Sequence, residues 1–154
     1  MYRTTLCYLI NGTQWLMLLR NKKKDDINKG KWIGVGGKIE TGETADACAR
    51  REIFEETGLV ADELNFRGMI HFYFEDDTEV CHVYTCERYH GEIHECNEGT
   101  LRWIEKDEIL SLPLWEGDRL FLRRLFEGDF KEFHLGLTYD RDGRLIHVDE
   151  GENV

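Results

Sequence analysis

The alternation of apolar and polar residues predicts that the chain opens with a β-hairpin. Residues 4–10 and 15–19 are two largely apolar runs of strand length, and Asn11-Gly12 lies between them. An Asn-Gly pair suits the tightest hairpin turns, because both residues tolerate positive φ. After a polar loop, residues 32–35 form a further short apolar piece.

Two segments are predicted to be helices. The first covers residues 45–57, where Thr44 can cap the start and Gly58 can end the helix in a left-handed conformation. The second covers residues 114–126, where helical spacing connects Leu120, Phe121, Arg124 and Leu125.

Apolar runs between polar turns predict the remaining strands. These cover residues 66–74, 80–88, 101–104, 130–138 and 145–148, with turn signals at Asp76-Asp77 and Asp142-Gly143. Strands and helices are therefore mixed, and each helix needs a sheet to cover its apolar side. The expected fold is a layered α/β sandwich. Because 154 residues suit one core and no flexible linker is evident, we expect a single domain over residues 1–154.

Composition narrows the classes of partner. The net charge of −11 repels long nucleic acid, but it permits a small phosphate ligand that arrives with a divalent metal. The first ten residues lack the features of a secretion signal, and no apolar run has the length of a membrane span. An odd count of five cysteines then favours free thiols. We therefore expect a cytoplasmic protein without a membrane partner.

Two local clusters of residues are candidates for binding a metal ion or phosphate. Cys86, His90, His94 and Cys96 surround an expected turn at Gly91, where a zinc site is conceivable. Their spacing fits none of the common ligand patterns, so a solvated hairpin tip is the preferred interpretation.

The second cluster is a basic stretch over residues 20–31. Such a run is most often a solvated loop. Here it lies just before the acidic motif described next, which favours contact with phosphate. Its basic residues are Arg20, Lys22, Lys23, Lys24, Lys29 and Lys31.

An acidic motif lies on the first predicted helix, within the sequence GKIETGETADACARREIFEETGL that begins at Gly37. At ~100° per residue, Glu52, Glu55 and Glu56 share about 100° of the helix circumference. Three like charges on one face need either solvent or a bound cation to neutralise them. Carboxylates and a bare carbonyl from a glycine-rich turn are ligands that Mg²⁺ or Mn²⁺ prefers.

Residues 37–59 resemble the signature of the Nudix hydrolase family at every fixed position. The resemblance implies an α/β/α sandwich with a mixed sheet, a loop-helix-loop catalytic motif, and magnesium-dependent hydrolysis of a nucleoside diphosphate linked to a further group. It also implies that metal is bound by Glu52, Glu55, Glu56 and the Gly36 carbonyl. Arg51 would orient this cluster through a salt bridge with Glu43.

A further acidic ligand is often donated from a loop outside the helix in related enzymes. Glu98 is the candidate, because it lies five residues before Trp103. Glu52, Glu56 and Glu98 all remain candidates for the general base, since a metal cluster shifts their pKa values together.

Three further segments are WIGVGGK at residues 32–38, the pair Phe72 and Phe74, and LPLWEGD at residues 112–118. Together they resemble the MutT-type branch of this family, whose members sanitise the nucleotide pool by hydrolysing oxidised purine nucleoside triphosphates such as 8-oxo-dGTP to the monophosphate and pyrophosphate. By this resemblance Trp115 would stack on the base and Asp118 would hydrogen-bond to it, and Phe72 and Phe74 would line the pocket. Lys23 would contact the phosphates.

One position departs from this pattern. Ile33 stands where some relatives bind the oxidised base through an Asn, and its side chain has no polar atom. Either backbone groups read the base, or the substrate is another nucleotide. The alternatives are a Nudix pyrophosphohydrolase acting on ADP-ribose, a dinucleoside polyphosphate or ordinary nucleoside triphosphates, and a non-catalytic nucleotide-binding module. The sequence leaves open a monomer or a homodimer.

Overall fold

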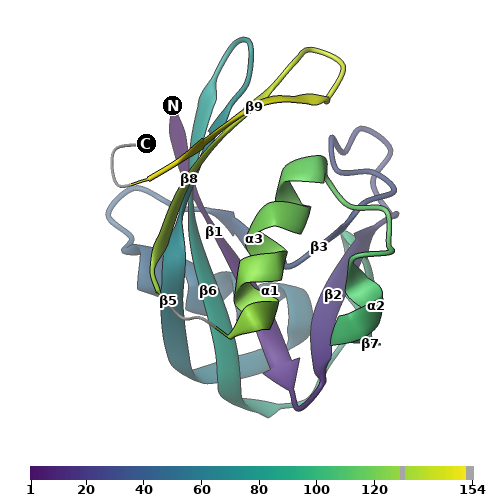
Figure 1. Cartoon of the computed structure of the whole chain (residues 1–154). Helices are drawn as coiled ribbons and strands as arrows, with labels where there is room; N and C mark the ends of the chain where they lie inside the picture. The colour runs from purple at the N-terminus through teal and green to yellow at the C-terminus, as the bar shows by residue number, and fades with distance from the viewer. Residues whose placement is uncertain (129–130, 152–154) are drawn as a thin grey trace.

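The computed structural model describes residues 1–128 and 131–151, and its central element is one mixed β-sheet (Figure 1). The strands are β1 (Tyr2–Asn11), β2 (Gln14–Arg20), β3 (Trp32–Ile33), β4 (Val35–Lys38), β5 (Leu59–Tyr73), β6 (Thr78–Gly91), β7 (Gly99–Glu105), β8 (Phe133–Tyr139) and β9 (Leu145–Glu150). The helices are α1 (Ala45–Thr57), α2 (Lys106–Ile109) and α3 (Glu116–Glu127).

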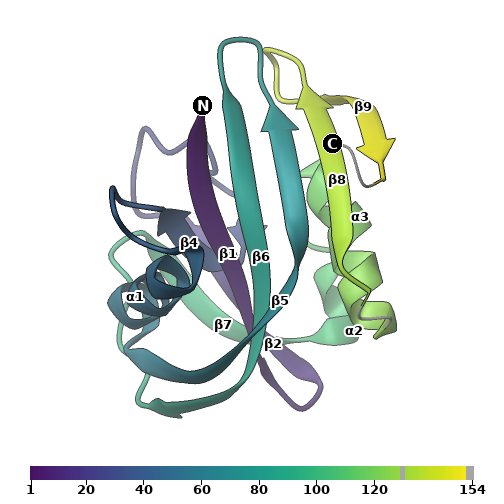
Figure 2. The same ribbon diagram turned by 90° about the vertical axis from the view of Figure 1, so that its left-hand side faces the viewer.

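The sheet runs in the order β3-β2-β1-β6-β5-β8-β9, with β4 paired to β1 and β7 paired to β2. The pairs β1/β6 and β5/β8 are parallel, and the other pairs are antiparallel. Helix α1 covers one face and α3 covers the other (Figures 1 and 2). The mixed-sheet sandwich predicted from the sequence is therefore confirmed.

The opening hairpin and α1 match their sequence signals. Gly12 has a φ of 62° in the turn between β1 and β2. Thr44 caps α1 by accepting a hydrogen bond from the Ala47 amide at 3.1 Å, and Gly58 ends it with a φ of 85°. On its inner side Ala49 and Ile53 are fully buried against β1, β5 and β6. This face fixes how the acidic side of α1 is turned.

Helix α3 begins two residues later than predicted, because Trp115 is extended and precedes the first turn as its N-cap. The side chains of Phe121, Leu122 and Leu125 are buried on the opposite face of the sheet from α1. The single turn α2 was not predicted, since four residues are too few to show helical periodicity.

Strand β5 begins at Leu59, well before the predicted 66–74. Polar residues interrupt its alternation, and its register against β6 shifts between Ala61 and Glu63 and twice more up to Gly68. A period-two pattern cannot survive such bulges.

Residues predicted to form a hairpin tip around Gly91 do not do so. Strand β6 continues to Gly91, which pairs with Leu59, and the His94 amide then donates to the Thr57 carbonyl at 2.8 Å. The predicted start of the next strand at residue 130 lies outside the described residues. Among the residues described, none of the helices has the length and apolar character needed to cross a bilayer.

Candidate active site

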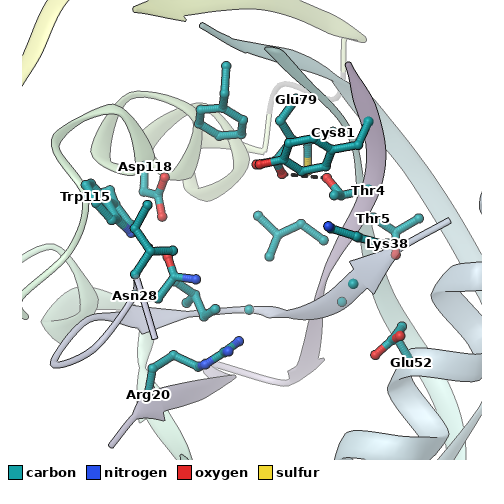
Figure 3. Close-up of a pocket in the computed structure, with 18 of the residues that line it drawn as sticks. Thr4, Thr5, Arg20, Asn28, Lys38, Glu52, Glu79, Cys81, Trp115 and Asp118 are labelled. Atoms are coloured by element: carbon teal, nitrogen blue, oxygen red, sulfur yellow. Dashed lines mark hydrogen bonds between the residues drawn. The ribbon is translucent and has the colours of Figure 1, made fainter. Parts of the chain in front are cut away.

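A cleft of about 480 Å³ opens between β4, α1, the N-terminus of α3 and the inner faces of β1, β5 and β6. Figure 3 shows its opposite walls, with Glu52 at one side and Trp115 and Asp118 at the other. The structure brings most of the residues singled out in the sequence to this one cleft. Those that line it are Ile33, Gly36, Glu52, Glu56, Phe72, Phe74, Glu98, Trp115 and Asp118.

Two glycines allow β4 to lie close to both β1 and the acidic helix. A Cβ atom on Gly36 would overlap the Thr5 carbonyl, and one on Gly37 would lie 2.6 Å from the Glu52 carboxylate. The Gly36 amide instead donates to Glu56 Oε2 at 3.3 Å. The glycine-rich strand therefore leaves room for both carboxylates at the edge of the cleft.

Arg51 organises the acidic side chains around it. Its Nε donates to Glu43 Oε2 at 2.8 Å and its Nη2 to Glu43 Oε1 at 3.0 Å, so this ion pair is bidentate. Its Nη1 donates to Glu52 Oε1 at 2.7 Å and to Glu55 Oε2 at 3.3 Å. The hydrogen bonds from Arg51 hold the pKa of Glu43 at about 2. The predicted salt bridge between Arg51 and Glu43 is present, and Arg51 also fixes one carboxylate oxygen of Glu52.

The interior carboxylate of this group is Glu56, which is only 6% exposed. Burial raises its pKa to about 9, and the neighbouring Glu98 and Glu52 contribute to the same shift. Burial likewise raises the pKa of Glu52. Carboxylates that destabilise each other in this way are suited to a divalent cation, which prefers oxygen ligands and offsets their charge.

The four predicted acidic ligands are not equivalent. Glu52, Glu56 and Glu98 line the cleft, whereas the side chain of Glu55 is 58% exposed and faces Arg51. In residues 1–128 and 131–151, no three carboxylate, imidazole or thiol groups already surround a single metal position. The chemistry of these oxygen donors fits Mg²⁺ or Mn²⁺.

Glu98 is held by two basic side chains, one from the end of β2 and one from the loop that follows it. Arg20 Nη1 lies 3.3 Å from Glu98 Oε2, and Lys23 Nζ lies 3.4 Å from Glu98 Oε1. Lys23 is exposed and does not line the cleft, whereas Arg20 does. In the sequence Arg20 is only one member of the basic stretch, because the pairing of β2 with β7 is what brings it to Glu98.

The other end of the cleft, which we call the aromatic end, consists of Phe72, Phe74, Trp115, Asp118 and Tyr139. The rings of Phe72 and Phe74 stack at 6.3 Å between centroids. The Trp115 ring packs edge-on to Tyr139 at 5.5 Å. Contacts from outside the aromatic end fix the same indole.

The loop that follows β2 supplies two of these contacts to Trp115. Asn28 accepts a hydrogen bond from its indole nitrogen at 2.8 Å, and the Lys31 ammonium lies 5.3 Å from its ring centroid. The hydrogen bond to Asn28 therefore fixes the orientation of an indole that lines the cleft.

Asp118 is a buried acid at the aromatic end. It lies in the first turn of α3 with 5% of its surface exposed. Burial, and after it the charge of Glu79, raises its pKa to about 7, against the opposing charges of Lys31 and Arg119. At neutral pH Asp118 is therefore able to donate as well as accept a hydrogen bond.

Several residues that line the cleft were not predicted. Most lie on the inner faces of strands distant in sequence, and only the parallel pairing of β1 with β6 brings them together. Their alternation marks them as inward-facing but gives no sign that they face a cleft rather than the core. They include Tyr2, Thr4, Asn28, Lys38, Glu79, Cys81 and Tyr139.

The conceivable zinc site is not formed. Cys86 Sγ donates to the Arg88 carbonyl, His90 Nδ1 lies 2.8 Å from Asp62, and His94 Nδ1 lies 2.8 Å from the Glu95 carbonyl. Cys96 Sγ accepts from the Glu98 amide. Each of the four thus has its own partner.

Comparisons with known proteins agree with this geometry. A family model described as the NUDIX domain matches residues 2–125. An oxidized purine nucleoside triphosphate hydrolase of Danio rerio is 36% identical over 138 residues, which cover 85% of this chain and 88% of the relative. The protein of that name from Mus musculus is 35% identical over 121 residues, covering 74% of this chain and 78% of the relative.

Solved structures give the same picture. The MutT protein of Bacillus halodurans superposes with a TM-score of 0.86 and 26% sequence identity, and the match covers 97% of each chain.

Proposed function

The chain belongs to the Nudix family, as a pyrophosphohydrolase, and within it we propose a magnesium-dependent hydrolase of oxidised purine nucleoside triphosphates. The products would be the nucleoside monophosphate and pyrophosphate. Removal of such nucleotides from the pool before DNA synthesis would be its biological role.

One observation carries this proposal: a single cleft joins a carboxylate wall to an aromatic end. Glu52, Glu56 and Glu98 lie on the wall, and the aromatic end has flat rings beside the buried acid Asp118. A nucleotide presents the same two chemistries, a polyphosphate that needs cations and a planar base that stacks. The two relatives named as oxidized purine nucleoside triphosphate hydrolases support this choice of substrate.

Mg²⁺ bound at the carboxylate wall would offset phosphate charge and lower the pKa of a water. Its ligands would be Glu52, Glu56, Glu98 and the Gly36 carbonyl, with Glu55 at the exposed side. The residues of the chain supply position. Arg51 holds Glu52 through the 2.7 Å bond. A phosphate that enters beside Glu98 would replace the Glu98 carboxylate as the partner of Arg20 and Lys23.

At the aromatic end, Trp115 and the pair Phe72 and Phe74 would enclose the base, and Asp118 would hydrogen-bond to its edge. Ile33 also lines the cleft and contributes only apolar contact from its side chain. Hydrogen bonds to the edge of the base would therefore come from groups other than the Ile33 side chain.

A substrate panel tests the proposal. We expect the purified protein with Mg²⁺ to release pyrophosphate from 8-oxo-dGTP with a higher kcat/KM than from dGTP, and to lose this activity when the metal is chelated. ADP-ribose, dinucleoside polyphosphates and ordinary triphosphates complete the panel. A higher kcat/KM for any of these three would replace the proposed substrate by that one.

Arg51→Lys is expected to lower kcat by roughly 10- to 100-fold with little change in KM. Lysine keeps the charge but cannot make the bidentate bond to Glu43 while also holding Glu52, and loss of such a supporting contact costs about that factor. Steady-state kinetics at saturating Mg²⁺ measure this effect. Arg50→Lys is the control, since Arg50 pairs with Asp46 outside the cleft.

A further inference from the structure

A carboxylate with no part in the family motif, Glu79, lies beside the aromatic end. In the sheet, Glu79 on β6 is paired with Tyr2 on β1 and with Phe72 on β5. Its side chain lines the same cleft as Asp118, as Figure 3 shows. The sheet therefore places a second acid next to the ring that is proposed to contact the base.

Two hydroxyl groups hold the Glu79 carboxylate in place. Thr4 Oγ1 donates to its Oε2 at 2.6 Å, and the Tyr2 phenol donates to its Oε1 at 3.2 Å. Burial and the charge of Glu79 raise the pKa of Tyr2 to about 12, so the phenol keeps its proton and remains the donor. Each carboxylate oxygen can accept a further hydrogen bond. Glu79 is thus a fixed acceptor with capacity left for a ligand.

Asp118 is the other acid at this end. In the described part of the chain no hydrogen bond to its carboxylate is formed, and the group faces the cleft. After burial, Glu79 is the main cause of its raised pKa, against the attraction of Lys31 and Arg119. A ligand here meets one acid that readily carries a proton and one that two hydroxyl groups hold as an acceptor.

This pair of acids selects among base edges. A guanine-type base presents O6 as an acceptor beside N1–H and the 2-amino group as adjacent donors. Two adjacent donors suit one carboxylate, and the neighbouring acceptor suits a protonated acid. Adenine has a single amino group flanked by ring nitrogens that accept, so a fixed carboxylate would repel it.

We propose that Glu79 is a specificity-determining residue that accepts hydrogen bonds from N1–H and the 2-amino group of a guanine-type base. The inference rests on the proposed function in one respect, that the aromatic end holds the base of a nucleotide. It adds a residue outside the family signature and a guanine-type edge as the group recognised.

Equilibrium binding of nucleoside monophosphates tests Glu79 without requiring turnover. The probes are 8-oxo-dGMP and 8-oxo-dIMP, which differ only by the 2-amino group, titrated calorimetrically in the absence of metal. Wild type is expected to prefer 8-oxo-dGMP by about tenfold or more, because a hydrogen bond to a charged group is worth at least that much. Glu79→Gln is expected to reduce the preference to within about threefold.

Glu75→Gln is the matched control, since Glu75 is an exposed glutamate near the same hairpin turn and pairs with Arg141. It is expected to keep the wild-type preference. If Glu79→Gln fails to fold, Thr4→Val serves instead, because it removes the 2.6 Å donor that positions the carboxylate and should narrow the preference severalfold.

The two proposals can fail separately. An unchanged preference in a folded Glu79→Gln protein, or no preference or no binding in wild type, overturns the role of Glu79 whatever the hydrolase activity. If the preference is lost as expected but wild type hydrolyses no oxidised purine triphosphate, then the role of Glu79 stands and the proposed function fails.

Discussion

Glu56→Gln is expected to lower kcat by roughly three orders of magnitude, the largest effect that we expect from a substitution in the chain. Glutamine keeps the shape of the side chain and its amide oxygen can still accept from the Gly36 amide, which lies 3.3 Å from Glu56 Oε2. What is lost is the anionic oxygen that would bind Mg²⁺ in the interior of the cleft. KM is expected to change little, because the contacts to base and phosphate lie elsewhere.

The same substitution should not destabilise the metal-free protein. Burial raises the pKa of Glu56 to about 9, so the free protein already holds this side chain largely protonated at neutral pH, and a neutral amide replaces a neutral acid. Pyrophosphate release at saturating Mg²⁺, together with urea denaturation in the absence of metal, separates the catalytic effect from the structural one.

Glu55→Gln is the matched comparison, since it removes one charge from the adjacent position. Its side chain is 58% exposed and faces Arg51, so a loss at least tenfold smaller than that of Glu56→Gln is expected. Retention of more than a tenth of the wild-type rate by Glu56→Gln would show that the interior carboxylate does not hold the metal.

The two acids differ although the sequence places them side by side, which marks the limit of what the sequence predicts. Local signals were enough for α1, whose start and end follow from Thr44 and Gly58. Spacing on that helix was enough to identify a shared acidic face. Which of its members is buried depends on how the glycine-rich β4 packs against α1, and that is a tertiary property.

The unpredicted part of the cleft has the same physical origin. Thr4 and Glu79 are 75 positions apart, and each looks like an ordinary inward-facing residue on its own strand. Only the parallel pairing of β1 with β6 places their side chains 2.6 Å apart. Parallel pairing carries no turn signal in the sequence, unlike the Asn-Gly hairpin. The sequence of one strand therefore does not show which strand pairs with it.

Asp118→Asn is expected to make the protein more stable at pH 8 while weakening its recognition of the base. Burial, and then Glu79, raises the pKa of Asp118 from 3.8 to about 7. The folded protein therefore binds more protons than the unfolded chain between about pH 4 and pH 7, and its stability falls as pH rises through that range. Above pH 7 the ionised, buried carboxylate is a net cost on the order of 4 kcal/mol.

Asparagine has the same shape and no charge, so at pH 8 the variant should lack the cost of the ionised carboxylate. Near pH 4 the carboxyl group of folded wild type is protonated, so neither wild type nor the variant should carry that cost. The favourable position of an acid in the first turn of α3 is worth only about 0.3–1 kcal/mol, too little to reverse the sign. Urea denaturation at the two pH values measures the difference. Glu116→Gln, an exposed acid in the same helical turn, is the control and should show no such pH-dependent gain.

Activity should move in the opposite direction from stability in Asp118→Asn. The amide cannot lose a proton and presents a fixed donor and acceptor, so kcat/KM for 8-oxo-dGTP is expected to fall by about 10- to 100-fold, largely through KM. An equal change in the free energy of unfolding at both pH values would mean that burial does not raise the pKa of Asp118. A gain in stability with unchanged kcat/KM would instead place the base away from Asp118. The combination of higher stability and weaker recognition is expected only if the chain keeps a buried acid in an unfavourable place because the base requires it.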